Sequence, residues 1–277
     1  MTTHLKGGST VFLPFNRGRD GGAGNPDNPD GFRTSYLWDE VWQKDSLLEI
    51  IAQYLQVVEL EDDKGKKTGE RSLIFPRYHQ LDAVRRLVAH AKGHGSGQHY
   101  LIQHSAGSGK SNTIAWLCHQ LSGLHDGEDR RVFDSIIVIT DRRVLDRQLR
   151  RTIRQFEQVR GVVEAITTQK SRNLARALDE GKEIIVTTLQ TFPFTVDLIG
   201  KLQGKRFAVV IDEAHSSQSG EGATSVKKIL SATTLEEAEK EEPPVEDGED
   251  VINARIEEEC GCVDDFPMSV SLHSQHE

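Results

Sequence analysis

Apolar positions along this chain follow two different spacings, and the places where the spacing changes outline its organisation. Within residues 75–211, short apolar runs of strand length alternate with longer stretches whose apolar side chains have helical spacing. The predicted strands are 99–104, 135–140, 162–167, 183–188 and 207–211, and the predicted helices are 78–92, 111–124, 143–158, 170–180 and 190–202. Strands separated by helices of this length predict an α/β fold with a mostly parallel sheet and helices on both faces.

The residues before this alternation have a different character. Residues 6–33 are rich in Gly, Asn, Asp and Pro, which predicts an irregular loop. Residues 37–56 predict a helix, and its apolar side is formed by Trp38, Val41, Trp42, Leu47, Leu48, Ile51 and Leu55. Residues 61–70 are polar and predict a turn or linker. We therefore divide the chain into a loop and helical segment (1–74), an α/β domain (75–232) and a tail that begins with an acidic segment (233–277).

The formal net charge of −9 hides an uneven distribution. Residues 236–259 hold twelve acidic and two basic side chains, which leaves 32 basic and 31 acidic residues elsewhere. The body of the chain is therefore near neutral and can carry a nucleic-acid face, while the acidic segment is typical of a solvated, flexible excursion. No apolar stretch reaches transmembrane length or resembles a signal peptide, and the three cysteines make no disulfide framework, so we expect a cytoplasmic protein with no membrane partner.

The loop after the predicted strand 99–104 carries the clearest candidate chemistry, in the run His104-Ser105-Ala106-Gly107-Ser108-Gly109-Lys110-Ser111. Glycines between a strand and a helix allow backbone N–H groups to surround a phosphate, and the helix N-terminus adds its positive end. Lys110 is expected to reach the β- and γ-phosphates of a nucleoside triphosphate, and the Ser111 hydroxyl to hold Mg²⁺. His104 stands where the strict pattern has its first glycine. A glycine-rich turn without nucleotide is the alternative, and the strand, Gly-Lys-Ser and helix in register argue against it.

A second candidate feature is Asp212-Glu213-Ala214-His215, directly after the predicted strand 207–211. The apolar, β-branched run suits a central parallel strand, which delivers Asp212 to the edge where ligands of open α/β sheets bind. Asp212 can hold Mg²⁺ through its water shell, and Glu213 can orient or deprotonate the attacking water. Taken alone, such a pair is usually a solvated strand end. Together with the phosphate-binding loop it predicts ATP and Mg²⁺ as cofactors, and Lys110, Asp212 and Glu213 as catalytic residues.

Further stretches carry a family resemblance: Phe12-Leu13-Pro14-Phe15-Asn16-Arg17-Gly18 with Gly21-Gly22-Ala23-Gly24-Asn25-Pro26, then Phe75-Pro76-Arg77-Tyr78-His79-Gln80, and finally Asp212-Glu213-Ala214-His215-Ser216-Ser217-Gln218-Ser219-Gly220. With the phosphate-binding loop, they make residues 9–259 resemble the first motor lobe of a superfamily 2 helicase or translocase. The closer resemblance is to the restriction (motor) subunit of type I restriction–modification enzymes. It implies a RecA-like P-loop lobe of the DEAH-box kind, double-stranded DNA as a partner, and methylase and specificity subunits in the same complex.

The resemblance also implies roles for individual residues. Gln80 matches the glutamine that reads adenine, although a polar residue at a helix N-terminus is the plain alternative. Two runs match motifs that contact the DNA backbone, and the candidate contact residues in them are Arg142, Arg143, Gln148, Thr188 and Gln190. The arginines crowded into the predicted helix 143–158 agree with this role, and a solvated helix face explains them about equally well.

Family members carry a nuclease domain before this region and a second motor lobe, with an arginine finger, after it. We therefore expect a fragment that binds ATP and hydrolyses it slowly, because the finger contributes ~10³-fold or more to turnover. Residues 260–277 do not resemble the family. Read from the third base of Cys260, however, the permitted codons include Arg-Met-Arg-Gly-Arg-Leu-Pro-Asn-Val-Ser-Phe-Phe-Ala-Phe-Thr-Ala, which is close to the family's continuation. The hypothesis of a frameshift near residues 257–260, with an out-of-frame tail after it, is tested by sequencing the coding DNA.

Three functions are in competition at this point. The first is the ATP-binding motor lobe of a type I restriction enzyme, which translocates DNA in support of cleavage by the endonuclease. The second is a non-catalytic module that binds ATP or DNA. The third is lobe 1 of another superfamily 2 DNA or RNA helicase. The DNA target sequence cannot be read from this chain, because a separate subunit recognises it in the family.

Overall fold

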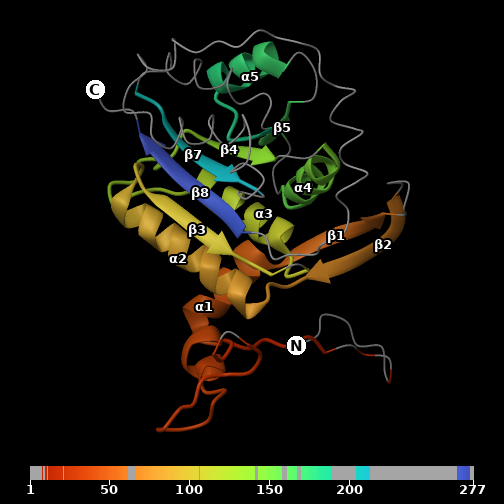
Figure 1. Ribbon diagram of the computed structural model, residues 1–277, viewed down its shortest axis with the longest axis vertical. Helices are drawn as coiled ribbons and strands as arrows, with labels where there is room; N and C mark the ends of the chain where they lie inside the picture. Colours follow the sequence, from red (N-terminus) through yellow and green to blue (C-terminus); the bar gives the residue numbers. More distant parts are fainter. Residues whose placement is uncertain are drawn as a thin grey trace, which may run out of the picture.

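The protein is built around a six-stranded sheet with the strand order β3-β8-β7-β4-β6-β5 (Figure 1). In a computed structural model of the chain, the described residues are 8, 10, 12–20, 22–61, 67–105, 107–140, 143–157, 161–166, 170–188, 204–212 and 267–274; residues 61, 67, 143–148, 170–172 and 267–274 are described by their backbone alone. The strands are β3 (His99–Gln103), β4 (Ser135–Thr140), β5 (Val163–Ala165), β6 (Ile184–Thr188), β7 (Arg206–Ile211) and β8 (Pro267–Ser274).

Four of these strands form the parallel sheet that the sequence predicts. β5 pairs with β6, β6 with β4, and β4 with β7, all in parallel register. β8, which the sequence pattern did not predict, lies between β7 and β3 and runs antiparallel to both. β3 and β7 therefore run in the same direction, and their carboxyl ends lie at one edge of the sheet.

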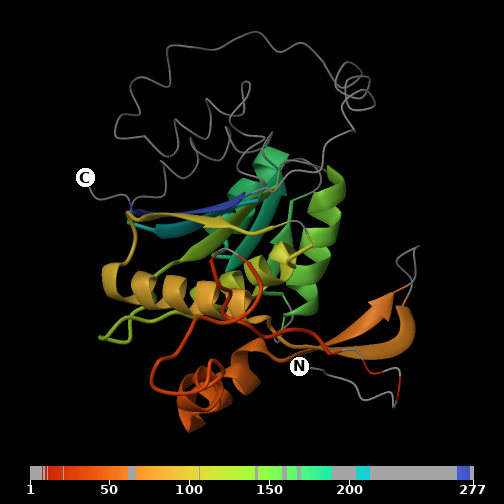
Figure 2. The same cartoon turned by 60° about the horizontal axis from the view of Figure 1, so that its bottom comes forward.

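Every residue of β4 and β6 is buried, because helices cover both faces of the sheet. One face packs against α2 (Tyr78–His94), α3 (Lys110–Ser122) and α4 (Arg143–Gln155), and the other packs against α5 (Lys170–Asp179) (Figures 1 and 2). Alternate side chains of β4 divide between the two: Ile136 joins the first core and Ile137 the second. This two-sided burial explains the continuous apolar runs, which parallel strands require.

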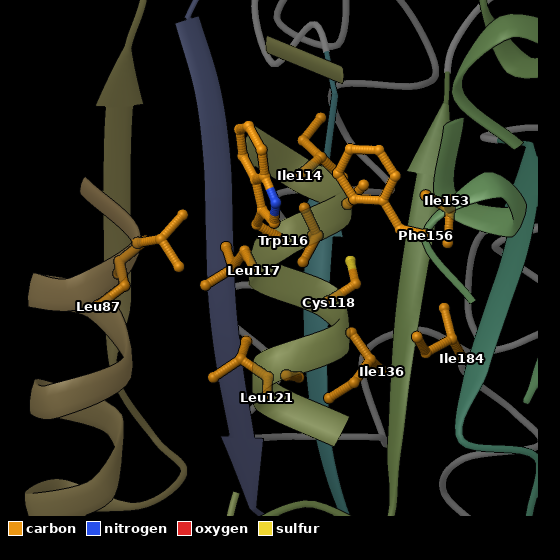
Figure 3. Close-up of a cluster of buried hydrophobic side chains, with 14 of the residues drawn as sticks. Leu87, Ile114, Trp116, Leu117, Cys118, Leu121, Ile136, Ile153, Phe156 and Ile184 are labelled. Atoms are coloured by element: carbon orange, nitrogen blue, oxygen red, sulfur yellow. The ribbon is translucent and has the colours of Figure 1, made fainter. Parts of the chain in front are cut away.

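The larger core is centred on α3. Trp116, Leu117 and Cys118 are almost wholly buried, and Trp116 packs against Phe156 at the end of α4 with 5.4 Å between the ring centroids (Figure 3). The indole Nε1 of Trp116 donates a hydrogen bond of 2.9 Å to the carbonyl of Tyr54. The same helix therefore holds the sheet and the N-terminal segment together.

The N-terminal segment corrects the prediction of one helix over 37–56. It consists of η2 (Leu37–Val41), α1 (Lys44–Glu49) and η3 (Ile50–Tyr54), with an extended residue at Gln43 (ψ 145°) that interrupts the helical path. The buried side chains are Val41, Ile50 and Tyr54. Most of the predicted apolar face is exposed: Trp38, Trp42, Leu47, Leu48 and Ile51.

Within the predicted linker 61–70, the described residues 61 and 67–70 are in β-strands. They belong to a hairpin of β1 (Gln56–Glu61) and β2 (Lys67–Ile74), which pair antiparallel with a register shift between Glu59 and Glu61. The predicted loop over 6–33 is irregular wherever it is described, apart from a bridge between Arg19 and Gly22. The predicted helix 190–202 lies outside the described residues. Where helices are described, none has both the length and the apolar character to cross a bilayer.

Candidate functional site

The predicted phosphate-binding loop joins β3 to α3 and has the backbone that an anion site needs. Gly107 and Gly109 both adopt left-handed conformations, with φ of +71° and +86°. Gly109 is the N-cap of α3, and no side chain caps that end of the helix. The first N–H groups of a helix have no partner within it, so this end of α3 offers donors and positive charge to an anion.

The side chains of the loop fit a phosphate group as well. Lys110 and Ser111 are half-buried at the first two positions of α3, which begins one residue before the predicted start at 111. Ser105 is exposed, and its carbonyl accepts a 3.2 Å hydrogen bond from the Ser108 amide. The Ser108 hydroxyl is buried with no hydrogen-bond partner among the described residues, which suits a position beside a polar ligand. Ala106 lies outside the described residues.

Gln80 is placed behind this loop and holds it. The side-chain oxygen of Gln80 accepts a hydrogen bond from the Arg77 amide (2.8 Å). Its Nε2 donates to the carbonyl of Gly109 (2.9 Å) and to that of Ser108 (3.3 Å). Gln80 is 3% exposed, so its amide is both buried and occupied. It is a polar residue in the first turn of α2, as the plain alternative held, and it also contacts the phosphate-binding loop.

Two histidines complete the support behind the loop. The Nε2 atom of His79 lies 3.2 Å from the Ser108 carbonyl, and the His79 ring meets the His104 ring edge-on with 5.0 Å between centroids. Burial, together with the electrostatic effects of the neighbouring His79 and Lys110, lowers the pKa of His104 to about 4. Burial also lowers the pKa of His79. Both rings are therefore neutral near pH 7 and bring no positive charge of their own to the loop.

The sequence does not reveal the role of His79, because its partner Ser108 stands 29 positions away. The contacts of Arg17 could not be predicted from the sequence for the same reason. Its Nε donates a 3.0 Å hydrogen bond to the Tyr78 hydroxyl, and its guanidinium lies over the Tyr36 ring, 4.8 Å from the centroid. Arg17 also forms an ion pair with Glu40. The N-terminal loop is thereby attached to the first residue of α2, next to His79.

Asp212 lies at the same sheet edge as the phosphate-binding loop. It directly follows β7, is 8% exposed, and its amide donates a 2.9 Å hydrogen bond to the Ile139 carbonyl. Ile211 of β7 and Leu101 of β3 both pair with Ser269 of β8, which lies between the two strands. The carboxyl ends of β7 and β3 therefore lie at nearly the same level along the strand direction. Glu213 lies outside the described residues.

The oxygen donors available fit Mg²⁺ held with a nucleotide. Ser111 supplies a hydroxyl and Asp212 a carboxylate, and Mg²⁺ is commonly held by one or two protein oxygens together with phosphates and water. In the described ranges, no group of three or more His, Cys, Asp or Glu side chains could hold a metal on its own. A metal ion at this edge of the sheet would therefore be bound by Ser111 and Asp212 together with phosphate oxygens.

The predicted DNA-contact residues are only partly described. Arg142 and Gln190 lie outside the described residues, and Arg143 and Gln148 are described by their backbone in α4. Thr188 is 4% exposed at the carboxyl end of β6. α4 buries Leu149 and Ile153 and exposes Arg151 and Arg154, and Phe156 directly after the helix is buried as well. This helix begins just after β4, so its first turn lies near the same sheet edge as Asp212.

Comparison with known proteins agrees with this geometry. A family model described as SWI2/SNF2 ATPase matches residues 79–235, more than half of the chain. A protein of Methanocaldococcus jannaschii, provisionally named type I restriction enzyme MjaVIIIP endonuclease subunit, is 25% identical over 240 residues. The alignment covers 74% of this chain and 22% of that relative, so the chain spans about a fifth of the relative's length. The match to the family model includes the supporting turn at His79, the phosphate-binding loop and Asp212, and the chain belongs to the SWI2/SNF2 ATPase family.

Proposed function

We propose that this chain is an ATP-binding motor lobe that contributes to ATP-dependent translocation on double-stranded DNA, as part of a type I restriction enzyme in the cytoplasm. The observation that carries the ATP site is the uncapped N-terminus of α3 behind the left-handed Gly109, at the same sheet edge as Asp212. The restriction assignment rests on the similarity to the Methanocaldococcus protein and on the sequence stretches around the site. Methylase and specificity subunits are the partners that such an assignment implies.

In the proposed mechanism, the backbone N–H groups of the loop from Gly107 to Lys110 bind the β-phosphate. The Lys110 ammonium stabilises charge on the β- and γ-phosphates, and Ser111 and Asp212 hold Mg²⁺. Glu213 orients the attacking water or accepts its proton. When bound, MgATP supplies the phosphoanhydride bond whose hydrolysis drives movement along DNA.

The proposed DNA contacts fall into two groups along the sequence, one in α4 and directly before it, the other at the carboxyl end of β6 and directly after it. Arg142, Arg143 and Gln148 of the first group, and Thr188 and Gln190 of the second, would bind phosphates of the DNA backbone. Such contacts fix position and affinity without reading sequence. Arg151 and Arg154, which are exposed on α4, would add attraction that weakens with salt.

ATP binding and hydrolysis by the 277-residue chain test the proposal, with and without duplex DNA. We expect Lys110→Ala to lower ATP affinity or turnover at least tenfold, while Lys92→Ala, an exposed lysine near the end of α2, leaves both unchanged. A hydrolysis rate that responds neither to duplex DNA nor to Lys110→Ala would rule out the motor function. ATP binding that depends on Lys110 without any turnover would instead favour the non-catalytic module.

Duplex DNA and RNA separate the proposal from another helicase of the same superfamily. We expect the protein to bind duplex DNA more tightly than RNA of equal length. The double variant Arg151→Ala with Arg154→Ala should bind all DNA sequences more weakly and reduce the salt dependence of binding. Equal or tighter binding to RNA would contradict the restriction assignment and leave the ATP site intact.

A further inference from the structure

One peptide group of the phosphate-binding loop is held by two side chains from the first turn of α2. The Ser108 carbonyl oxygen lies 3.2 Å from the Nε2 of His79 and accepts a 3.3 Å hydrogen bond from the Nε2 of Gln80. A carbonyl can only accept a hydrogen bond, so the Nε2 of His79 carries a proton and acts as the donor. Two neighbouring residues of α2 therefore converge on a single oxygen of the loop.

The same peptide group carries the N–H of Gly109. A trans peptide is planar, and its C=O and N–H bonds point in opposite directions. Because the carbonyl faces His79 and Gln80, the Gly109 N–H points away from these two side chains. Among the described residues the Gly109 N–H has no hydrogen-bond acceptor, and the Ser108 hydroxyl is buried without a partner. The loop therefore keeps a donor for a ligand on the side opposite to α2.

Glycine at position 109 does not fix this orientation by itself. Rotation of the peptide group changes the φ angle of Gly109, which is +86° here, and glycine adopts positive and negative φ about equally readily. The rotated peptide would turn the Ser108 carbonyl towards the ligand, where its partial negative charge repels a phosphate. Contacts from outside the loop therefore decide whether this peptide can bind an anion.

We propose that His79 is a positioning residue of the ATP site, which fixes the Ser108–Gly109 peptide so that the Gly109 N–H faces the β-phosphate. This inference rests on the proposed ATP-binding function. The His104 ring, which is 7% exposed, meets the His79 ring edge-on at 5.0 Å and holds it in place. Gln80 assists less, because its Nε2 also donates to the Gly109 carbonyl, and that bond is the shorter of the two at 2.9 Å.

Selective isotope labelling makes this peptide visible by NMR. Serine with ¹³C at its carbonyl, combined with ¹⁵N-glycine, gives a through-bond signal only from Ser–Gly peptides, and the sequence has four of them, at 96–97, 108–109, 122–123 and 219–220. Ser108→Ala removes the Ser108–Gly109 signal and thereby assigns it. The Ser122–Gly123 signal comes from the far end of α3 and is the reference for an intact fold.

Tripolyphosphate is the probe, because it has the phosphates of ATP without the base and ribose. In the unaltered protein we expect it to move the Gly109 amide proton downfield while the Ser122–Gly123 signal stays in place. His79→Phe keeps a ring against His104 but has no donor. This variant should lose the movement and bind tripolyphosphate and ATP about tenfold more weakly. His79→Gln offers an amide N–H at nearly the same reach and should restore both.

His94→Phe is the control, because His94 is an exposed histidine at the end of the same helix, and it should behave as the unaltered protein does. If His79→Phe does not fold, His79→Asn replaces it, because its amide is too short to reach the Ser108 carbonyl. The inference is overturned if bound tripolyphosphate leaves the Gly109 amide unmoved, or moves it equally in the variant without a donor. Failure of the proposed function is distinct, because the unaltered protein would then bind neither tripolyphosphate nor ATP, and the inference would fall with it.

Discussion

Gly109 occupies the most constrained position of the phosphate-binding loop. Its backbone is left-handed, with φ of +86°, and a Cβ atom at this position would lie 2.6 Å from the Nε2 of Gln80. Gly107 is also left-handed, with φ of +71°, but a Cβ there would meet nothing within 4 Å. The two glycines therefore separate the effect of backbone strain from the effect of lost space.

Gly109→Ala should be the more damaging of the two substitutions. Strain in the left-handed region costs roughly 1–2 kcal/mol at either glycine, and only Gly109→Ala also displaces Gln80 from the loop. We expect chemical denaturation to show a larger loss of unfolding free energy for Gly109→Ala than for Gly107→Ala. A fluorescent ATP analogue should bind at least tenfold more weakly to Gly109→Ala than to Gly107→Ala. Equal losses in the two variants would show that the contact with Gln80 does not matter.

His104 makes the stability of the domain depend on pH. Its pKa falls from 6.5 in the unfolded chain to about 4 in the folded protein, because the buried ring resists protonation. Between these values the unfolded chain binds the extra proton, so the free energy of unfolding decreases as pH falls from 6.5 towards 4. The stabilising contribution is complete above pH 6.5. At 1.36 kcal/mol per pH unit, the loss amounts to roughly 3 kcal/mol.

His104→Gly tests this expectation and restores the glycine of the strict phosphate-binding pattern. Urea denaturation at pH 7.5 and at pH 5 should show a smaller difference in unfolding free energy for the variant than for the unaltered protein. Only the difference between the two pH values is informative, because a new glycine changes stability at every pH. Identical pH dependence in both proteins would exclude His104 as the source.

At the scale of elements, local patterns predicted the α/β part well. The strand expected at 135–140 is β4 itself, because a continuous apolar run bounded by polar residues leaves little choice. The segment before residue 75 was predicted badly, since its apolar spacing does not show which side faces the core. Contacts from distant residues decide this: Trp116 bonds Tyr54, and Arg85 pairs with Glu49.

Some parts of the candidate site could likewise be predicted from local sequence, and others could not. The loop up to Lys110 and the Asp212 position could be predicted, because each is a short run of sequence next to a strand. The contacts of Gln80 with Ser108 and Gly109 span 28 and 29 positions, and His79 and His104, whose rings are in contact, are also distant in sequence. No local pattern encodes such contacts, so the support that α2 gives to the loop becomes visible only in the fold.

The attachment of α2 to the loop leads to a prediction about nucleotide choice. Gln80→Glu keeps the shape of the side chain but replaces its donor with an oxygen facing two carbonyls, which should remove roughly 1–3 kcal/mol of stability. Because the loop is proposed to hold phosphates and not the base, ATP and GTP affinities should fall together, by about tenfold at 1.4 kcal/mol. Gln98→Glu, in the turn after α2, is the control. A loss of ATP affinity alone would show instead that Gln80 reads adenine.

At the scale of the whole molecule, the sheet depends on the segment nearest the end of the chain. In the part of the chain that the structure describes, β8 is the one strand that pairs with β3, and it also pairs with β7 (Figure 1). β3 leads into the phosphate-binding loop and β7 leads to Asp212. The lateral distance between the two halves of the candidate site is therefore set by β8.

Deletion of residues 267–277 should separate these halves. β3 would lose its ladder partner and expose a row of backbone N–H and C=O groups, so hydrogen exchange should show faster exchange of the amides in β3 than in β4. We expect the free energy of unfolding to fall by roughly 3 kcal/mol or more, at about 1 kcal/mol for each lost hydrogen bond, and ATP binding to weaken with it. Deletion of 275–277 alone, which leaves β8 complete, is the control. Unchanged protection of β3 after the longer deletion would mean that the tail has no structural role, as an out-of-frame sequence predicts, and that β3 does not depend on β8.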